Sequence, residues 1–200
     1  MSRVATLLIT TMLAVAMTAC SQGEPAPQFE SIDITGADYT GEFELTDHNG
    51  ERRTLEDFSG QVVTVFFGFT QCPDVCPASL LMMSDVMENL GEDADRVQVL
   101  FITVDPERDT PELLAHYVPR FDERFLGLYG DEDETAEVAA NFRVFYAKSG
   151  DTSGMNYTID HTAGTYVFDP EGRLRLYAPQ ALEAPVEAMT HDIALLLDGQ

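Results

Sequence analysis

The sequence predicts an α/β domain in which a central mixed sheet is flanked by helices, and three stretches predict it. Residues 62–67 are all β-branched or aromatic and only Thr64 is polar, a composition typical of a strand buried on both faces. Residues 80–90 place apolar side chains at three- and four-residue steps, which is the period of an amphipathic helix. Residues 97–104 form a second apolar run, so the three stretches predict a right-handed parallel crossover.

The other elements extend this unit on both sides. Apolar and polar residues alternate over 41–45, a turn signal follows at 47–50, and residues 54–58 fit either a short strand or a helical turn. Residues 148–156 hold two glycines and two serines and predict an exposed, mobile loop. The remaining predicted elements are helices over 110–117, 133–141 and 186–197, a short strand over 143–147, and a hairpin of strands 165–168 and 173–177. This order predicts a thioredoxin-like fold with an N-terminal β extension over residues 37–200.

The first nineteen residues predict a signal peptide of the lipoprotein type. Arg3 precedes an uncharged apolar run from Val4 to Met17, which is too short and wrongly flanked for a spanning helix. Small residues then lead into Cys20, the residue that would be lipidated and become the first of the mature chain. This predicts a lipid anchor on the periplasmic side of a bacterial membrane, with residues 20–36 as a tether. The alternative is an ordinary cleaved signal that leaves Cys20 as a free thiol.

The charge balance excludes one class of ligand. The chain has 35 Asp and Glu residues against 11 Lys and Arg residues. A surface this acidic repels nucleic acid and the headgroups of anionic membranes, so neither is expected as a direct ligand.

Cys72 and Cys76 are the cysteines that remain after Cys20. One close pair in an exported chain does not make a disulfide-stapled scaffold, so a functional pair is expected. Cys76 falls at the predicted start of a helix, where unpaired N–H groups and the helix dipole lower the pKa of a thiol. Such a pair can close a disulfide or bind a soft metal ion. In an oxidising compartment, a partner must keep it reduced if it is to hold metal.

A metal site at this pair needs a third ligand, and His161 is the candidate. It follows the predicted loop and is expected to begin a strand near the cysteines; the alternative is a histidine that only caps that strand. Two thiolates and one imidazole suit Cu(I) and would also accept zinc. The other histidines, which are expected at the surface or in satisfied polar contacts, are His48, His116 and His191.

Three aspartates lie near the predicted site. Asp74, between the cysteines, would tune the charge of the thiols or contact a partner, or it is simply a turn residue. Asp105 and Asp109 follow the second strand and are expected to order the loop beside the site through hydrogen bonds. A plain turn and helix cap is the alternative for these two.

Three segments of the chain, in order and at characteristic separations, resemble the Sco/SenC family. The resemblance covers about residues 40 to 197 and is carried by Cys72-Pro73-Asp74-Val75-Cys76-Pro77, by residues 104–110, and by Asp160-His161-Thr162-Ala163 with Tyr166 and Asp169-Pro170. It implies a thioredoxin fold on which Cys72, Cys76 and His161 bind a copper ion, Cu(I) or Cu(II). Thr162 departs from the more usual serine, and the lipid anchor departs from the spanning helix of many relatives.

The same resemblance implies a function and partners. The function is a copper chaperone that helps assemble the copper A centre of cytochrome c oxidase subunit II. The partners are that subunit, another periplasmic copper chaperone and a thioredoxin-like reductant. A thiol-disulfide reductase acting on the cysteines of that subunit is the main alternative, and a redox or copper sensor is another.

A peroxidase and a conventional enzyme do not fit the residues. Peroxidases with a Cys-Pro loop on this fold carry a threonine three residues before the reactive cysteine, where this chain has Phe69 and Pro73. The sequence also lacks the pattern of a catalytic triad, a phosphate-binding loop or a paired-carboxylate site.

Overall fold

The computed structural model describes residues 28–38, 40–179 and 185–200. The predicted leader, Cys20 and the first part of the predicted tether lie outside the described residues. The elements, in chain order, are β1 (Ile32–Asp33), β2 (Glu44–Asp47), β3 (Arg52–Thr54), η1 (Leu55–Phe58), β4 (Val62–Gly68), α2 (Val75–Leu90), η2 (Gly91–Arg96), β5 (Val97–Thr103), α3 (Pro111–Tyr117), η3 (Val118–Arg120), β6 (Leu126–Tyr129), α4 (Glu132–Asn141), β7 (Tyr146–Gly150), β8 (Tyr157–His161), β9 (Gly164–Phe168), β10 (Leu174–Pro179) and α5 (Val186–Leu197).

The main sheet of the described residues is mixed, as the sequence predicts. Its eight strands run in the order β1-β10-β9-β4-β5-β6-β2-β3. β4 and β5 pair in parallel over their whole length, from Val62 beside Val97 to Gly68 beside Thr103, and β5 and β6 are also parallel. The remaining pairs are antiparallel. Every residue of β4 is buried, which explains why Thr64 is its only polar side chain.

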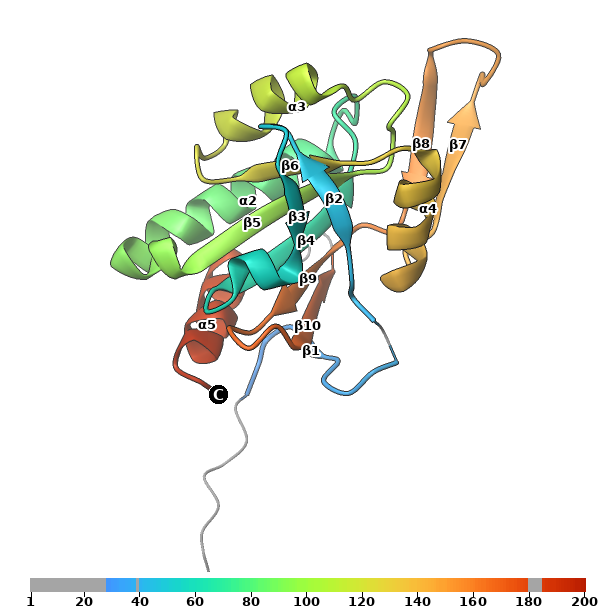
Figure 1. Ribbon diagram of the computed structural model, residues 1–200. Helices are drawn as coiled ribbons and strands as arrows, with labels where there is room; N and C mark the ends of the chain where they lie inside the picture. Colours follow the sequence, from blue (N-terminus) through green and yellow to red (C-terminus); the bar gives the residue numbers. More distant parts are fainter. Residues whose placement is uncertain (1–27, 39, 180–184) are drawn as a thin grey trace, which may run out of the picture.

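Helices cover both faces of this sheet and form an α/β domain (Figure 1). α2 and α5 pack against each other, and Tyr117 at the end of α3 packs with its ring tilted against Phe101 of β5. On the other face, Phe142 directly after α4 packs edge-on against Phe67 of β4, with 5.1 Å between ring centroids. The β2–β3 hairpin joins the sheet beside β6, so the predicted N-terminal β extension is present.

The segment before β9 differs from the prediction. β7 and β8 form a separate two-stranded antiparallel sheet that stands at one corner of the molecule (Figure 1). The expected strand over 143–147 therefore begins at Tyr146, and the expected loop over 148–156 is limited to the turn at 151–156. His161 ends β8 and does not begin a strand. In the sequence of β8, the apolar Tyr157 and Ile159 alternate with polar residues, and in the structure these two side chains are buried while their neighbours are exposed. This alternation is the sequence pattern that predicts a strand.

Two other differences concern short elements. Residues 54–58 are the end of β3 and a 3₁₀ turn, so the helical alternative is correct for Leu55–Phe58. β6 was not predicted, because Leu126–Tyr129 is only four residues long and contains a glycine.

The N-terminal segment is docked on the domain from Glu30 onward. Both carboxylate oxygens of the buried Asp192 accept backbone N–H groups, from Glu30 at 2.8 Å and Ser31 at 2.7 Å. β1 then pairs with β10, and Ile34 bonds to Arg175. The part of the expected tether from Glu30 onward is therefore docked on the domain, and residues 20–27 lie outside the described residues. In the part of the chain that the structure describes, the helices lack the combined length and apolarity needed to span a bilayer.

Candidate metal centre

The two thiols lie where the central strand gives way to a helix. β4 ends at Gly68, and α2 begins at Val75, so Cys76 occupies the first turn of the helix as predicted. Both cysteines are free; Cys76 is fully buried and Cys72 is partly exposed. The backbone N–H of Cys76 points at the Sγ atom of Cys72, with 3.5 Å between N and S. The helix start therefore stabilises negative charge on Cys72.

His161 reaches the same place from β8. Its Nε2 atom lies 3.8 Å from the Sγ atom of Cys76. The imidazole ring is held edge-on by Phe66 and Phe69, whose ring centroids lie 6.3 and 5.9 Å away. Its Nδ1 atom lies 3.0 Å from the carbonyl oxygen of Thr162. Because a carbonyl only accepts, this contact assigns the proton to Nδ1 and leaves the Nε2 lone pair facing the thiols.

The two thiols share one proton unequally. A hydrogen bond from Cys76 lowers the pKa of Cys72 to about 5, since it and the N–H groups of Asp74 and Cys76 outweigh the opposing effect of burial. The hydrogen bond to Cys72 and burial both raise the pKa of Cys76, so the lowered pKa expected for Cys76 at the helix start is wrong, and it is Cys72 whose pKa is lowered. At neutral pH the pair carries one negative charge, on Cys72. A metal ion that binds both sulfurs would displace the proton of Cys76.

The segment between β4 and α2, residues 69–74, is called the cysteine loop here because it contains Cys72. Asp109 joins this loop to the end of β5. Its carboxylate accepts hydrogen bonds from the backbone N–H of Thr70 at 3.0 Å, the hydroxyl of Thr70 at 2.5 Å and the hydroxyl of Thr103 at 2.6 Å. All three donors are satisfied, so the start of the cysteine loop is fixed relative to β5. Burial raises the pKa of Asp109 although these hydrogen bonds lower it.

Asp105 and Asp74 have different surroundings. Asp105 is buried, and its carboxylate binds Arg108 and the hydroxyl of Tyr157, which lies 2.7 Å away. Asp74 is exposed at the N-cap position of α2, where its side chain makes no capping hydrogen bond. Its backbone N–H, not its carboxylate, contributes to the low pKa of Cys72. Sequence reasoning singled out the aspartates and missed the tyrosine.

The other histidines lie elsewhere. His48 accepts a hydrogen bond from the N–H of Gly127 at 3.0 Å, and burial lowers its pKa. His116 is exposed on α3, and His191 on α5 lies near the carbonyl of Gln28. Among residues 28–38, 40–179 and 185–200, no three Cys, His, Asp or Glu side chains are arranged to enclose a metal ion as they stand.

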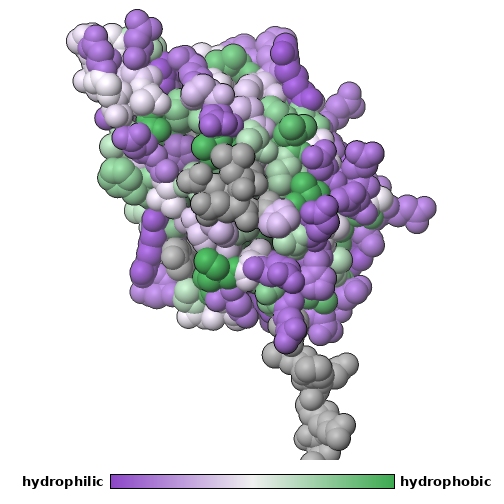
Figure 2. Space-filling model, turned by 180° about the vertical axis from the view of Figure 1, so that it is seen from behind, coloured by the Kyte–Doolittle hydropathy of each residue, from purple (hydrophilic) through white to green (hydrophobic). Residues whose placement is uncertain are grey.

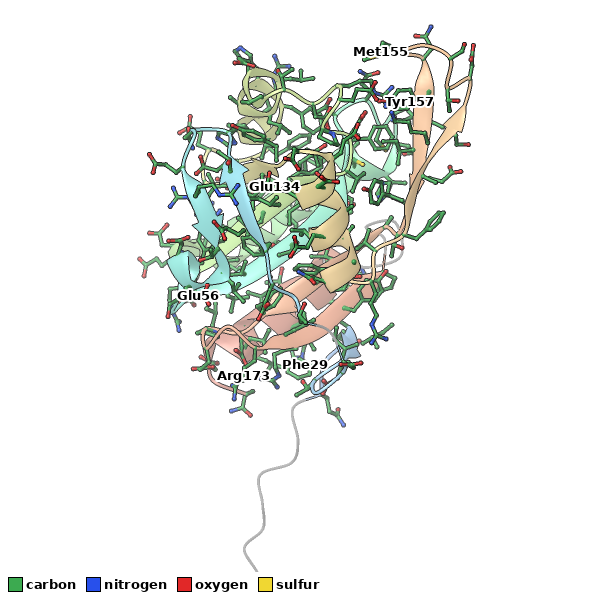
Figure 3. All side chains as sticks on the ribbon, turned by 45° about the vertical axis from the view of Figure 1, so that its right-hand side comes forward. Phe29, Glu56, Glu134, Met155, Tyr157 and Arg173 are labelled. Carbon is green, nitrogen blue, oxygen red and sulfur yellow. The ribbon has the colours of Figure 1, made fainter. Side chains whose placement is uncertain are left out.

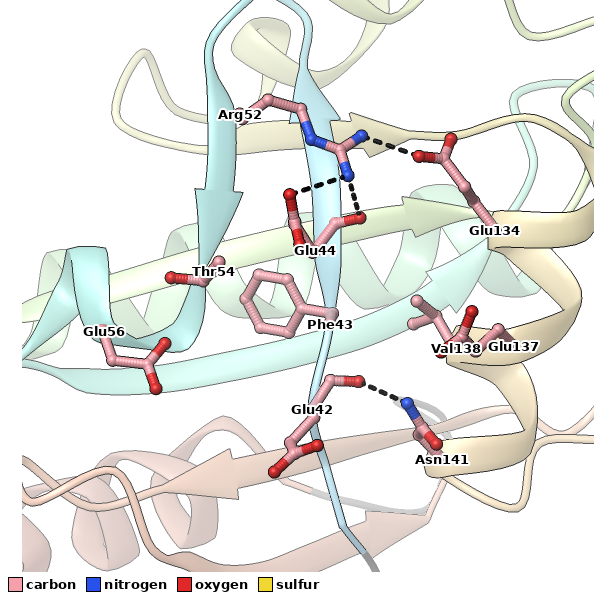
Figure 4. Close-up of a pocket in the computed structure, with 10 residues that line it drawn as sticks. All are labelled: Glu42, Phe43, Glu44, Arg52, Thr54, Glu56, Glu134, Glu137, Val138 and Asn141. Atoms are coloured by element: carbon pink, nitrogen blue, oxygen red, sulfur yellow. Dashed lines mark hydrogen bonds and ion pairs between the residues drawn. The ribbon is translucent and has the colours of Figure 1, made fainter.

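One hollow of the described surface lies away from the thiols. A pocket of about 380 Å³ lies between the β2–β3 hairpin and α4 (Figure 4). Glutamates predominate in its lining, and Arg52 binds Glu134 at 2.8 Å and Glu44 at 3.3 Å across it. Hydrophilic residues also predominate on the face shown in Figure 2, in keeping with the acidic composition. No cysteine lines this pocket.

The fold and the site together define a thioredoxin-like domain that presents two thiols and an imidazole beside the carboxyl end of its central strand. The chain belongs to the SCO1/SenC family, whose model matches residues 33–198.

Relatives of known name and structure support this assignment. The SCO2-like protein of Rickettsia felis is 42% identical over 134 residues, which are 66% of this chain and 65% of that protein. The chain thus aligns with slightly less than two thirds of that relative's length. A structure of Bradyrhizobium japonicum ScoI with copper bound is 42% identical, with a TM-score of 0.72, 80% of this chain covered and 99% of that one. The solution structure of apo Sco1 from Thermus thermophilus is 39% identical, with a TM-score of 0.75 and coverages of 85% and 98%.

Proposed function

We propose that this protein is a copper chaperone that binds one copper ion through Cys72, Cys76 and His161. Two soft sulfur donors and one imidazole nitrogen match the ligand preference of Cu(I). The copper-bound structure of the Bradyrhizobium japonicum relative supports the choice of metal. The recipient we propose is the copper A site of cytochrome c oxidase subunit II.

One observation supports this proposal: a segment far away in the sequence brings the imidazole of His161 next to one of the two thiols. Cys76 and His161 are 85 positions apart, yet their side chains lie 3.8 Å from each other. The tautomer assigned to His161 leaves Nε2 free to coordinate. Cys72 is already a thiolate at neutral pH, so only the proton of Cys76 has to leave when both sulfurs bind an ion.

Copper competition tests the ligand set. Reduced full-length protein is loaded with Cu(I) and titrated with a chromophoric chelator, and His161→Ala and Cys72→Ser are compared with wild type. His116→Ala is the matched control, because His116 is an exposed histidine on α3. We expect one copper ion per wild-type and control chain, and loss to the chelator at much lower concentration in the other two variants. Equal retention in His161→Ala and wild type would remove His161 from the site.

Transfer tests the proposed recipient. Protein loaded with Cu(I) is mixed with the reduced soluble domain of cytochrome c oxidase subunit II, and samples are then oxidised with ferricyanide. The visible absorption of a copper A centre is measured after this step, because the centre absorbs visible light only in its mixed-valence form. We expect that absorption to develop with loaded wild type and not with loaded Cys72→Ser. If free copper at the same concentration produces it equally fast, the protein is not a specific donor. Another periplasmic copper chaperone is proposed as the source of the ion.

The low pKa of Cys72 favours a second candidate function, a thiol-disulfide reductase that acts on the cysteines of subunit II. A thiolate at neutral pH attacks disulfides, and the adjacent Cys76 can resolve the mixed disulfide. A thioredoxin-like reductant would then regenerate the pair. In this case His161→Ala would reduce oxidised subunit II as fast as wild type, whereas Cys72→Ser would not.

The proposed location is the periplasmic side of a bacterial membrane, with a lipid on Cys20 as the anchor. The apolar run from Val4 to Met17 and the small residues before Cys20 support it. Labelling of growing cells with a radioactive fatty acid tests the anchor. We expect label on the wild-type protein and none on Cys20→Ser.

A further inference from the structure

One guanidinium group joins the two segments that carry the candidate ligands. Arg108 lies in the loop after β5, and its side chain is only 2% exposed. Its Nη1 atom donates to the side-chain oxygen of Gln71 at 3.2 Å, and Gln71 directly precedes Cys72. The same Nη1 atom lies 3.1 Å from the carbonyl oxygen of Met155 and 2.7 Å from that of Tyr157. Arg108 thus binds the cysteine loop on one side and the β7–β8 hairpin on the other.

The guanidinium is itself held in place. Its Nε atom donates to the buried carboxylate of Asp105, whose other oxygen accepts the hydroxyl of Tyr157 at 2.7 Å. The guanidinium carbon lies 3.6 Å from the ring centroid of Tyr157 and 5.8 Å from that of Phe69. Figure 3 shows Tyr157 beside the body of the domain and Met155 farther out along the hairpin. Cation–π attraction and hydrogen bonds therefore act on the same pair, Arg108 and Tyr157.

The hairpin needs such a support. β7 and β8 form their own two-stranded sheet and make no ladder with the main sheet. A two-stranded hairpin alone is marginally stable in water. The loop after β5 supplies contacts to both strands, because Glu107 pairs with Lys148 of β7 while Arg108 binds Tyr157 of β8. His161 lies four residues beyond Tyr157 on the same strand, so its place depends on where β8 is held.

We propose that Arg108 is a positioning residue that sets the distance between the imidazole of His161 and the two thiols. It contacts none of the three proposed ligands and acts through Gln71 and Tyr157. The inference rests on the proposed function for the identity of the bound ion, but the positioning itself concerns the metal-free protein as well.

Arginine is required here because one planar group has to reach several acceptors at once. Nε binds Asp105 while Nη1 binds two carbonyl oxygens and an amide oxygen, and the plane stacks on an aromatic ring. A lysine would keep the charge but has a single ammonium group and no plane to stack. Arg108→Lys is therefore a specific test. Arg53→Lys is its matched control, since Arg53 also pairs with a buried carboxylate, that of Asp47, but in the β2–β3 hairpin.

The first measurement is amide hydrogen exchange on the reduced, metal-free, full-length protein. In Arg108→Lys we expect exchange of residues 157–161 to be about tenfold faster, because the hairpin is held less firmly, with β4 unchanged. Arg53→Lys should leave residues 157–161 as in wild type. Unchanged exchange of 157–161 in Arg108→Lys would overturn the proposal. If amide exchange in β4 became faster by the same factor, the proposal would also be overturned, because Arg108 would then support the whole domain.

The second measurement is Cu(I) competition with the same variants. Residues that orient metal ligands change affinity by roughly 10- to 100-fold, and we expect a loss of this size in Arg108→Lys and wild-type affinity in Arg53→Lys. Wild-type affinity in Arg108→Lys would overturn the proposal. If wild type itself binds no copper, the proposed function fails, and the exchange measurement still decides whether Arg108 positions β8.

Tyr157→Phe keeps the proposal testable if Arg108→Lys does not fold. This variant retains the ring beneath the guanidinium and the carbonyl that Arg108 binds, but it removes the hydroxyl that binds Asp105. We expect faster exchange of residues 157–161 and weaker copper binding, each by less than in Arg108→Lys. Wild-type values for both would overturn the proposal.

Discussion

The Nε2 atom of His161 lies 3.8 Å from the Sγ atom of Cys76, although the strand that carries the histidine belongs to a different sheet from the one that ends at the thiols. The thiols are fixed by covalent continuity with β4 and α2, while the imidazole is fixed through the β7–β8 hairpin. The sulfur–nitrogen distance therefore depends on how the hairpin is held against the main sheet.

The first prediction concerns the reactivity of Cys72. In reduced, metal-free protein, the rate of alkylation of Cys72 by iodoacetamide should rise with pH through a midpoint near 5, because its thiolate forms there. Cys76 should react far more slowly, because it is buried and its pKa is raised. Mass spectrometry of the alkylated peptides at each pH measures both rates.

The control for this prediction is Cys76→Ala, which removes the hydrogen bond that lowers the pKa of Cys72 most. The midpoint should then move up toward the ordinary thiol pKa of about 8.5. An unchanged midpoint in Cys76→Ala would contradict the assigned cause.

The second prediction concerns Gly68 at the end of β4. A Cβ atom there would lie 2.8 Å from the Sγ atom of Cys76 and 2.8 Å from the ring of Phe101. Gly68→Ala should destabilise the protein by about 1–3 kcal/mol through overpacking, and it should weaken copper binding by displacing the sulfur. Urea denaturation of the metal-free protein measures the first effect, and chelator competition the second.

Gly154→Ala is the matched control, because a Cβ atom on Gly154 would meet nothing within 4 Å. It should leave both quantities as in wild type. If Gly68→Ala behaves like Gly154→Ala, the close packing of β4 against Cys76 is not a constraint on the site.

The third prediction concerns the pH dependence of stability at Asp109. Burial raises the pKa of this carboxyl above 3.8, so the folded state holds its proton to higher pH than the unfolded state. The stabilisation from protonated Asp109 is complete below pH 3.8 and is lost as pH rises through the folded pKa. The free energy of unfolding of wild type minus that of Asp109→Asn should therefore fall over this window.

Urea denaturation of both proteins between pH 3 and pH 7 measures this difference, because the contributions of the other carboxyl groups cancel in the subtraction. Asp131→Asn is the comparison variant, since Asp131 is an exposed N-cap residue. A difference between wild type and Asp109→Asn that rises with pH would contradict the raised pKa.

The core of the fold could be predicted because its signals are local. The apolar run of β4 and the helical period of α2 each occupy one stretch of chain, and both elements formed where they were expected. The β7–β8 hairpin was obscured because the small and polar residues that favour a loop lie inside β7 as well as in the turn. Tyr157 and Ile159 alternate with polar neighbours, and this pattern would have identified β8.

The contacts around the site could be predicted only in part. Asp105 and Asp109 were expected to order a loop through hydrogen bonds, and the structure places both side chains in buried hydrogen bonds. The sequence did not indicate that Arg108 binds a strand 49 positions away, since tertiary contacts of this kind have no local pattern. The same is true of Asp192, which binds an N-terminal segment 162 positions away.

The last prediction concerns this N-terminal attachment. Asp192 accepts the N–H groups of Glu30 and Ser31 from the buried face of α5, and Figure 1 shows this end of the molecule far from the β7–β8 hairpin. Asp192→Ala should lower the free energy of unfolding by about 2–4 kcal/mol, because two hydrogen bonds to a carboxylate are lost. Proteolysis within residues 28–33 should become faster, since the segment is no longer docked. Copper affinity should stay at the wild-type value because the proposed ligands are not touched.

Two variants separate the anchor from a general loss of stability. Asp198→Ala removes an exposed aspartate at the end of the same helix and should change neither stability nor proteolysis. Asp192→Asn retains one acceptor oxygen and should be intermediate in both. If Asp192→Ala is cleaved within residues 28–33 no faster than Asp198→Ala, β1 alone holds the segment, and Asp192 serves only the packing of α5. If copper affinity falls together with stability, the two ends of the domain are coupled, and the site depends on how the N-terminal segment is docked.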